Sequence, residues 1–379
     1  MTDNAVPPTF SPLHQVHADA GAGFTDFAGW QMPVRYGSEL EEHHAVRNAA
    51  GLFDLSHMAE IIVTGNESAA FLDYALCGKL SAIAIAQAKY SLLLSDDGGI
   101  IDDVIVYRTH ENRYLVVANA GNRFQAAGAL ASRAANFDTT VIDESDSVAL
   151  VAVQGPSSRA ILEALPQLEL TEDLAELKYY RSILGTYQGE EIMVARTGYT
   201  GEDGFELYVV ADHAESLWKN LMVVGTDHGL VPAGLACRDT LRLEAGMPLY
   251  GHELSLDILP AQAGLARVVV LSKEDDFVGR AANEAGPPAD ARVLVGLTSE
   301  GRRAGRAGYP ILAGEGGGDF EVGVVTSGAL SPTLGHPIAM AYVDPQFAET
   351  DTQLFIDVRG KRIPASVTAL PFYKRKASE

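Results

Sequence analysis

The chain has 379 residues, 47% of them hydrophobic, and its 28 basic and 50 acidic side chains give a formal net charge of −22. This length predicts two or three domains, each able to bury a core without disulfides. So acidic a surface disfavours general binding to nucleic acid or membranes, and no segment approaches the roughly 18 continuous apolar residues of a membrane helix. With two cysteines, Cys77 and Cys237, and no visible signal peptide, we expect a cytoplasmic protein.

Helices and strands are mixed in the first third of the chain. Residues 1–23 include three early prolines and are expected to be irregular. Residues 90–107 give the clearest hairpin, because two apolar runs flank Asp96-Asp97-Gly98-Gly99, where glycine supplies the positive φ of a tight turn. The other expected elements are a helix at 39–50, a strand at 61–66, a helix at 67–76, a strand at 113–119 and a helix at 121–135.

A second unit is predicted to begin near residue 143, with strands at 148–155, 191–196 and 205–210 and helices at 157–165, 213–225 and 232–245. Pro232 is expected to open the last of these helices. The Pro-Pro stretch at 282–292 reads as a linker. Five short strands follow it and predict an all-β terminal domain, in which the glycines of 314–318 turn a hairpin. Strands and helices do not alternate regularly, which favours an α+β fold.

The sequence carries neither a Rossmann nor a P-loop motif. The segment RTGYTGEDGFE at 196–206 has regularly spaced glycines, but an acidic loop without lysine is a poor phosphate cradle. His43 and His44 are adjacent on a helix, where side chains diverge by about 100° and do not converge on one ion. We therefore predict no metal site. Ser56-His57 is interpreted as a turn, since no nucleophile motif surrounds it.

Four residues leave a functional and a structural reading open. Asp102 and Asp103 point to opposite faces of their strand, so they should not form one acid dyad, and either carboxylate faces solvent or a partly buried cavity. Arg238 lies beside the apolar stripe of its helix, where it forms a structural ion pair or meets an anionic ligand. Glu206 alternates with Tyr208, which fits both packing at a core edge and ligand binding.

Six blocks in fixed order carry a resemblance to a known family. They are FAGWQMPVRY at 27–36, GLFDLSHMAE at 51–60, DDGGIIDDVIVYR at 96–108, RTGYTGEDGFELYV at 196–209, PAGLACRDTLRLEAGMPLYGHEL at 232–254 and LPFYKR at 370–375. Together the blocks resemble the aminomethyltransferase, or T-protein, family of the glycine cleavage system. The resemblance spans nearly the whole chain, from about residue 24 to residue 373.

The resemblance implies both a fold and an activity. The family fold is a three-domain cloverleaf around a central folate cavity, with a discontinuous first α+β domain (1–55 and 145–250), a second (56–144 and 251–285) and a C-terminal β-barrel (291–379). The family moves an aminomethyl carbon from the dihydrolipoyl arm of H-protein to tetrahydrofolate. Lipoylated H-protein is thus the expected partner and tetrahydrofolate the co-substrate. No metal, flavin or nicotinamide is expected, because no electrons change hands.

The resemblance also implies roles for individual residues. Asp103 matches the catalytic aspartate, Glu206 would accept hydrogen bonds from the pterin, and Arg238 and Tyr373 would hold the folate. The remaining expected pocket residues are Tyr199, Tyr90, Asn119 and Met58.

Three related activities are alternatives. A folate-dependent demethylase would share the cavity but accept a methyl group from sulfur or oxygen. The folate half of a dimethylglycine or sarcosine dehydrogenase would need a flavin domain, for which the sequence has no motif. A non-enzymatic folate protein of iron–sulfur cluster maintenance would carry a KGCYxGQ-like segment, where this chain has RTGYTGEDG.

Overall fold

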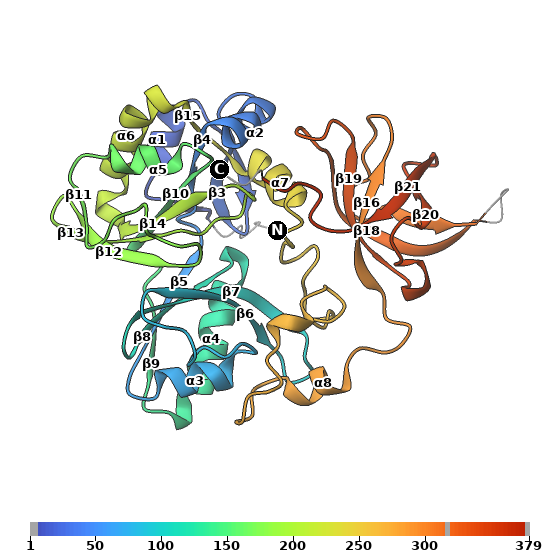
Figure 1. Ribbon diagram of the computed structural model, residues 1–379, viewed down its shortest axis with the longest axis horizontal. Helices are drawn as coiled ribbons and strands as arrows, with labels where there is room; N and C mark the ends of the chain where they lie inside the picture. Colours follow the sequence, from blue (N-terminus) through green and yellow to red (C-terminus); the bar gives the residue numbers. More distant parts are fainter. Residues whose placement is uncertain (1–6, 315–318, 376–379) are drawn as a thin grey trace, which may run out of the picture.

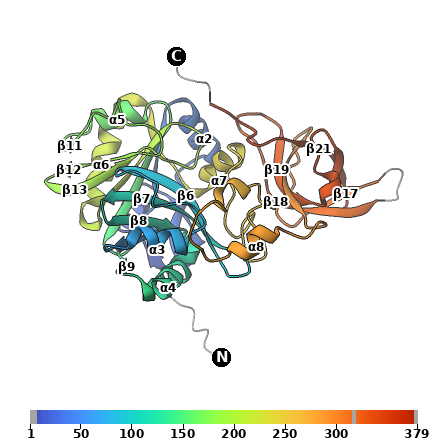
Figure 2. The ribbon, with the colours of Figure 1, turned by 60° about the horizontal axis from the view of Figure 1, so that its bottom comes forward.

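The computed structural model describes residues 7–314 and 319–375, which form three lobes (Figure 1). One lobe is built on a seven-stranded sheet, the second on a five-stranded sheet, and the third is a closed six-stranded barrel. Both views show the barrel at one side of the other two lobes (Figures 1 and 2). The predicted α+β class and the β-barrel at the end of the chain are confirmed.

The first lobe is antiparallel except where β15 joins β4 in parallel. Three helices pack on one face of its sheet and bury residues such as Ile161, Leu217 and Leu221. Those helices are α1 (His14–Asp19), α5 (Ser158–Glu163) and α6 (Ala214–Gly225). In sheet order the strands are β11 (Leu168–Leu170), β12 (Ser182–Tyr187), β13 (Glu190–Ala195), β14 (Gly204–Val210), β10 (Val148–Gln154), β4 (Ala50–Asp54) and β15 (Leu230–Pro232).

Between β4 and β10 the chain leaves the first sheet and builds the second lobe. In sheet order its strands are β6 (Gln87–Leu94), β7 (Ile100–His110), β8 (Arg113–Ala118), β5 (Ala59–Thr64) and β9 (Thr140–Asp143). Helices α3 (Ser68–Ala75) and α4 (Arg123–Arg133) cover one face. The other face packs on the seven-stranded sheet, where Ile62 and Val117 meet Leu150 and Met193 in one core. The two sheets thus share an inner seam, while the exact domain boundaries remain a prediction.

Residues 1–23 were predicted to be irregular, and this is wrong for the part that the structure describes. Strand β1 (Thr9–Phe10) joins β3 (Trp30–Arg35) and β2 (Gly23–Phe27) in a small sheet, and α1 follows β1. The cause is tertiary: Asp54 of β4 accepts hydrogen bonds from Ser11 and pairs with buried His17 at 2.8 Å. These partners lie far along the chain, so local sequence does not reveal them.

The barrel and the segment leading to it contain the remaining elements. The expected linker is partly helical, since α8 covers Arg280–Ala285. The hairpin at 314–318 lies largely outside the described residues, between β17 and β18. In barrel order the strands are β16 (Val293–Ser299), β19 (Pro337–Val343), β18 (Phe320–Leu330), β17 (Pro310–Ala313), β20 (Gln353–Asp357) and β21 (Arg362–Thr368).

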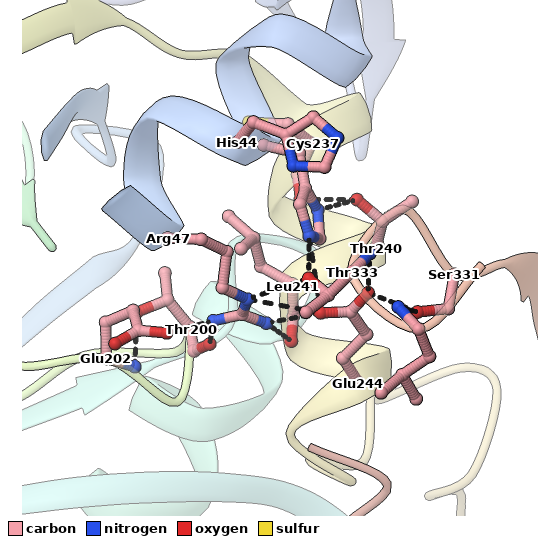
Figure 3. A network of polar contacts seen from close by, with 12 residues as sticks. His44, Arg47, Thr200, Glu202, Cys237, Thr240, Leu241, Glu244, Ser331 and Thr333 are labelled. Atoms are coloured by element: carbon pink, nitrogen blue, oxygen red, sulfur yellow. Dashed lines mark hydrogen bonds and ion pairs between the residues drawn. The ribbon is translucent and has the colours of Figure 1, made fainter. Parts of the chain in front are cut away.

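A buried polar network joins the first lobe to the barrel through α2 (Glu39–Asn48) and α7 (Leu235–Glu244), as Figure 3 shows. Arg47 donates to Glu244 at 2.7 Å and to Glu202 at 2.8 Å. Glu244 also accepts from Ser331 and from the backbone N–H of Thr333, both in the loop after β18. The network fixes α7 between the lobes.

Pro232 was predicted to open α7, but it ends β15 instead, and the helix begins at Leu235.

Candidate functional site

A cavity of about 320 Å³ opens where the inner seam of the two sheets meets the segment that follows α7. We call it the central cavity. The seven-stranded lobe, the five-stranded lobe and the chain after α7 all contribute to its wall. Its polar and aromatic lining residues are Phe27, His57, Tyr90, Asp103, Asn119, Tyr180, Tyr199, Glu206, Tyr208 and Arg238.

All the site residues predicted from the sequence except Tyr373 line this cavity, including Met58 beside His57. Tyr373 lies instead near the buried polar network of Arg47 and Glu244 that joins the first lobe to the barrel, which we call the interlobe network. Its ring packs on the guanidinium of Arg47, with Cζ 4.1 Å from the ring centre, and its backbone N–H donates to Glu244. The other predicted site residues therefore lie together on the central cavity, whereas Tyr373 does not line it.

Asp103 is held on β7 with its carboxylate in the cavity wall. Tyr90, on the neighbouring strand β6, donates its hydroxyl to Asp103 Oδ2 at 3.0 Å. Asn119 Nδ2, just past the end of β8, donates to Asp103 Oδ1 at 2.8 Å. Because both partners come from strands that pair with β7, the sheet itself sets the direction of the carboxylate. Burial raises the pKa of Asp103, which makes it a better proton acceptor than an exposed aspartate.

Asp102 and Asp103 point to opposite faces as predicted, but the sequence did not reveal that a third side chain contacts both. The Asn119 side chain lies at the strand end and donates from Nδ2 to both carboxylates, at 2.8 Å in each case. Asp102 is fully buried and also accepts from Asn122 Nδ2 at 2.7 Å. Burial, and then the negative charge of Asp103, raises the pKa of Asp102 to about 7. The two carboxylates are therefore electrostatically linked across one amide.

Glu206 faces the cavity from β14. Its carboxylate accepts hydrogen bonds from the hydroxyls of Thr197 and Tyr107, the latter at 3.3 Å. Burial raises its pKa, while the Thr197 hydrogen bond and the charge of Arg238 oppose that rise. Glu206 is thus a positioned acceptor, and it lies on the cavity side of the strand because side chains alternate along β14.

Arg238 extends from α7 into the cavity, and its guanidinium forms no hydrogen bond or ion pair with other described residues. It stacks instead on the ring of Tyr199, with Cζ 4.7 Å from the ring centre. The Tyr199 hydroxyl donates to the carbonyl of Pro248, which fixes the ring. The forked donors of Arg238 therefore remain available to a carboxylate or carbonyl of a ligand.

Sequence reasoning missed several wall residues, of which His57 is the most unexpected. The turn predicted at Ser56-His57 is present, but His57 is also buried against Phe27, with ring centres 5.3 Å apart. Burial lowers the pKa of His57 to about 4, so the ring is neutral near pH 7. Tyr180 and Tyr208 also line the cavity. Of these two, only Tyr208 could have been assigned to the cavity from the sequence, because it alternates with Glu206 along the strand.

The glycines of the segment 196–206 serve packing and not phosphate binding. A Cβ at Gly198 or Gly204 would collide with the amide of Gln154, and Gly201 has φ +80°. Gln154 Nε2 in turn donates to the carbonyl of Thr197 at 3.1 Å. The loop can therefore lie close to β10, which places Tyr199 and Glu206 on the same cavity.

Comparisons with known proteins agree over almost the whole chain. Two family models match, the GCVT N-terminal domain over residues 13–273 and the glycine cleavage T-protein C-terminal barrel domain over residues 292–374. The aminomethyltransferase of Cutibacterium acnes is 58% identical, covering 96% of this chain and 98% of that protein. The aminomethyltransferase of Streptomyces avermitilis is 54% identical, covering 99% and 100%.

A solved structure gives the same result. The glycine cleavage system aminomethyltransferase T from Bartonella henselae superposes with a TM-score of 0.88 at 37% identity, covering 97% of this chain and 99% of that one. The similarity includes both sheets and the barrel. The chain therefore belongs to the aminomethyltransferase family, the T-proteins of the glycine cleavage system.

Proposed function

We propose that this aminomethyltransferase binds tetrahydrofolate in the central cavity and transfers to it the carbon of the aminomethyl group on the dihydrolipoyl arm of H-protein. The C–S and C–N bonds of that carbon break, and two bonds to folate nitrogens form. The two folate N–H protons pass to the thiolate and to the departing nitrogen, which gives methylenetetrahydrofolate, ammonia and the dihydrolipoyl thiol. Atoms and charges balance without an oxidant, so the step needs no redox cofactor such as a flavin or nicotinamide.

The observation that carries this proposal is the placement of Asp103, Glu206 and Arg238 on one cavity. Glu206 supplies the acceptor that the amino and N–H groups of a pterin require. Arg238 supplies unpaired donors for a folate carbonyl or carboxylate. The rings of Tyr90 and Tyr199 give aromatic surfaces for the planar parts of the ligand.

In this proposal Asp103 is the catalytic residue. As ammonia departs, the transferred carbon acquires cationic iminium character. A buried carboxylate nearby stabilises that charge, since few water molecules screen it. The raised pKa of Asp103 also suits it to orient or deprotonate the attacking folate amine. Tyr90 and Asn119 then act as positioning residues that hold both carboxylate oxygens.

Partners and compartment follow from the same assignment. Lipoylated H-protein is the proposed donor, and neither nucleic acid nor membrane is a proposed partner of so acidic a chain. Among the described residues, no helix has both the length and the apolar composition needed to cross a bilayer. Cys77 and Cys237 are buried free thiols, which supports the proposal of a reducing cytoplasm.

A donor comparison tests the proposed function. The purified protein is mixed with tetrahydrofolate and aminomethylated H-protein, and methylenetetrahydrofolate and ammonia are measured. We expect equal amounts of both products. A parallel reaction with a methyl-sulfur donor should give no methyl transfer, and methyl transfer there without aminomethyl transfer would replace the proposal by the demethylase alternative.

A further inference from the structure

A second cavity, of about 190 Å³, lies farther along the inner seam between the two sheets. We call it the seam cavity. Strands β7, β8, β10 and β14 line both cavities, and β5, β12 and β13 complete the wall of the seam cavity. On β7 the wall changes from Ile105 to Thr109, and on β8 it changes from Val117 to Leu115. Because alternate side chains share a face, both cavities open from one inter-sheet layer.

Two tyrosines stand between the cavities. Tyr208 of β14 lines both of them, and its hydroxyl donates to the hydroxyl of Tyr107 at 3.4 Å. Tyr107 in turn donates to Glu206 at 3.3 Å. The two rings meet edge to face, with centres 5.7 Å apart. A hydrogen-bonded pair of rings therefore lies where the two cavities share a wall residue.

The seam cavity contains an unpaired carboxyl group. Glu60 of β5 is fully buried, and neither of its carboxyl oxygens has a hydrogen-bond partner among the described residues. Its neighbours on the cavity wall are mostly apolar, namely Ile62, Leu115, Val148, Leu184 and Met193. A buried carboxyl without a donor is costly, so a ligand that brings N–H donors is favoured there.

The mouth of the seam cavity carries more negative than positive charge. Glu144 and Arg113 pair weakly at 4.0 Å, with 39% and 35% of their side chains exposed, and exposed Glu191 adds a second carboxylate. The charges of Arg123 and Asp143 also act on Glu60, and their signs are opposite. A small cation is therefore favoured over an anion, both in the cavity and at its mouth.

We propose that the seam cavity is a binding site and exit path for ammonia, with the Glu60 carboxyl as its ligand. This inference rests on the proposed function, because aminomethyl transfer releases ammonia in the adjacent central cavity. Because neutral ammonia carries no charge, it can move along a cavity with apolar walls. At Glu60 it accepts the carboxyl proton and becomes ammonium; only a proton moves, and the carboxylate left behind balances the new charge.

The protonation state of Glu60 supports that step. Burial raises its pKa well above the usual value, with Asp143 adding to the rise and Arg123 opposing it. An empty site therefore holds a carboxylic acid, which is the form that can protonate ammonia. Ammonium then leaves toward the carboxylates at the mouth, where water solvates it, and Glu60 regains a proton from solvent.

The reverse reaction tests the site, because ammonium is then a substrate. With methylenetetrahydrofolate and reduced H-protein fixed, we expect E60Q to raise the KM for ammonium chloride by about tenfold, the effect of losing a hydrogen bond to a charged partner. The KM for methylenetetrahydrofolate should stay unchanged. E190Q is the matched control, because Glu190 is exposed beside Glu191 on β13 but does not line the cavity. E191K, which places a cation at the mouth, should raise the ammonium KM by a smaller factor.

A second readout does not depend on turnover. Ammonium chloride should raise the thermal midpoint of the wild type more than sodium chloride does at equal ionic strength, and E60Q should lose that difference. If E60Q retains the wild-type KM for ammonium and the same specific stabilisation while the forward reaction proceeds normally, the seam site is overturned and the proposed function stands. If the wild type fails to transfer the aminomethyl carbon at all, the proposed function itself fails.

Discussion

The interlobe network and the central cavity both contain buried charged side chains, and they differ in how completely those side chains are paired. In the interlobe network, Arg47 donates to Glu202, Glu244 and the carbonyl of Thr200, and His43 is hydrogen-bonded through both ring nitrogens. In the central cavity, Arg238 has no polar partner among the described residues. In the interlobe network the charged groups pair with one another and hold the lobes together. In the central cavity donors and acceptors remain available to a ligand. Charged side chains that are fully paired therefore stabilise the fold, whereas those left without a partner are available for chemistry.

The largest effect is expected at Asp103. D103N keeps the shape of the side chain and can still accept from Asn119, with the Tyr90 hydroxyl accepting from the new amide N–H instead of donating, but it removes the negative charge. We expect turnover to fall by about 10² to 10⁴ with tetrahydrofolate binding retained, because charge stabilisation and proton transfer are both lost. Steady-state transfer assays and folate titration measure the two quantities. D97N, in the exposed turn of the same hairpin, is the control, and normal turnover of D103N would remove Asp103 from the mechanism.

Breaking the network should instead cost stability. E244Q removes the charge that pairs with Arg47, and we expect the free energy of unfolding to fall by about 3 kcal/mol, since buried Arg47 then keeps Glu202 as its charged partner but loses Glu244. Urea unfolding measures this loss. E163Q breaks an exposed pair with Arg159 and should change stability little. Equal stability losses in the two variants would contradict the structural role of the network.

Arg238 offers the converse test. R238M should raise the KM for tetrahydrofolate by about tenfold or more, because a charged donor to the ligand is lost. Stability should fall little, since burial lowers the pKa of Arg238 and its guanidinium stacks on Tyr199 but forms no hydrogen bond or ion pair with the described residues. Unfolding and kinetics measured on the same preparation separate these effects. A marked loss of stability with an unchanged KM would assign Arg238 to the fold.

Acid should weaken the network gradually. Burial raises the pKa of Glu244, but the hydrogen bonds from His43 and Ser331 and the charge of Arg47 outweigh burial and hold the pKa at about 2, below its ordinary value of 4.5. The ionised form is therefore stabilised in the folded state. Its contribution, about 3 kcal/mol, is complete above pH 4.5 and is lost as the pH falls toward 2. Unfolding at several pH values should show this loss in the wild type and not in E244Q.

The sequence predicted the elements whose signals are local. The hairpin of β6 and β7 follows from its apolar runs and glycines, and α2 begins directly after Ser38, whose hydroxyl accepts from the N–H of Glu41. Two predictions were wrong: that residues 1–23 are irregular, and that Pro232 opens a helix. In the first case Asp54 organises residues from a distance, and in the second Pro232 pairs with Leu52 in the sheet.

For the site, residue patterns alone left each role open, and the family resemblance supplied the set. Strand periodicity correctly separated the faces of Asp102 and Asp103. It could not predict that Asn119, from another strand end, would link them. It also could not place His57 in the cavity wall or reveal the seam cavity, because both depend on how two sheets that are separate in sequence pack together.

A crystal structure with tetrahydrofolate bound tests the central claim most directly. We expect the pterin amino group and ring N–H groups against Glu206, and the two nitrogens that receive the carbon on the side of Asp103. A folate bound elsewhere, or one in the central cavity with those nitrogens turned away from Asp103, would contradict the account.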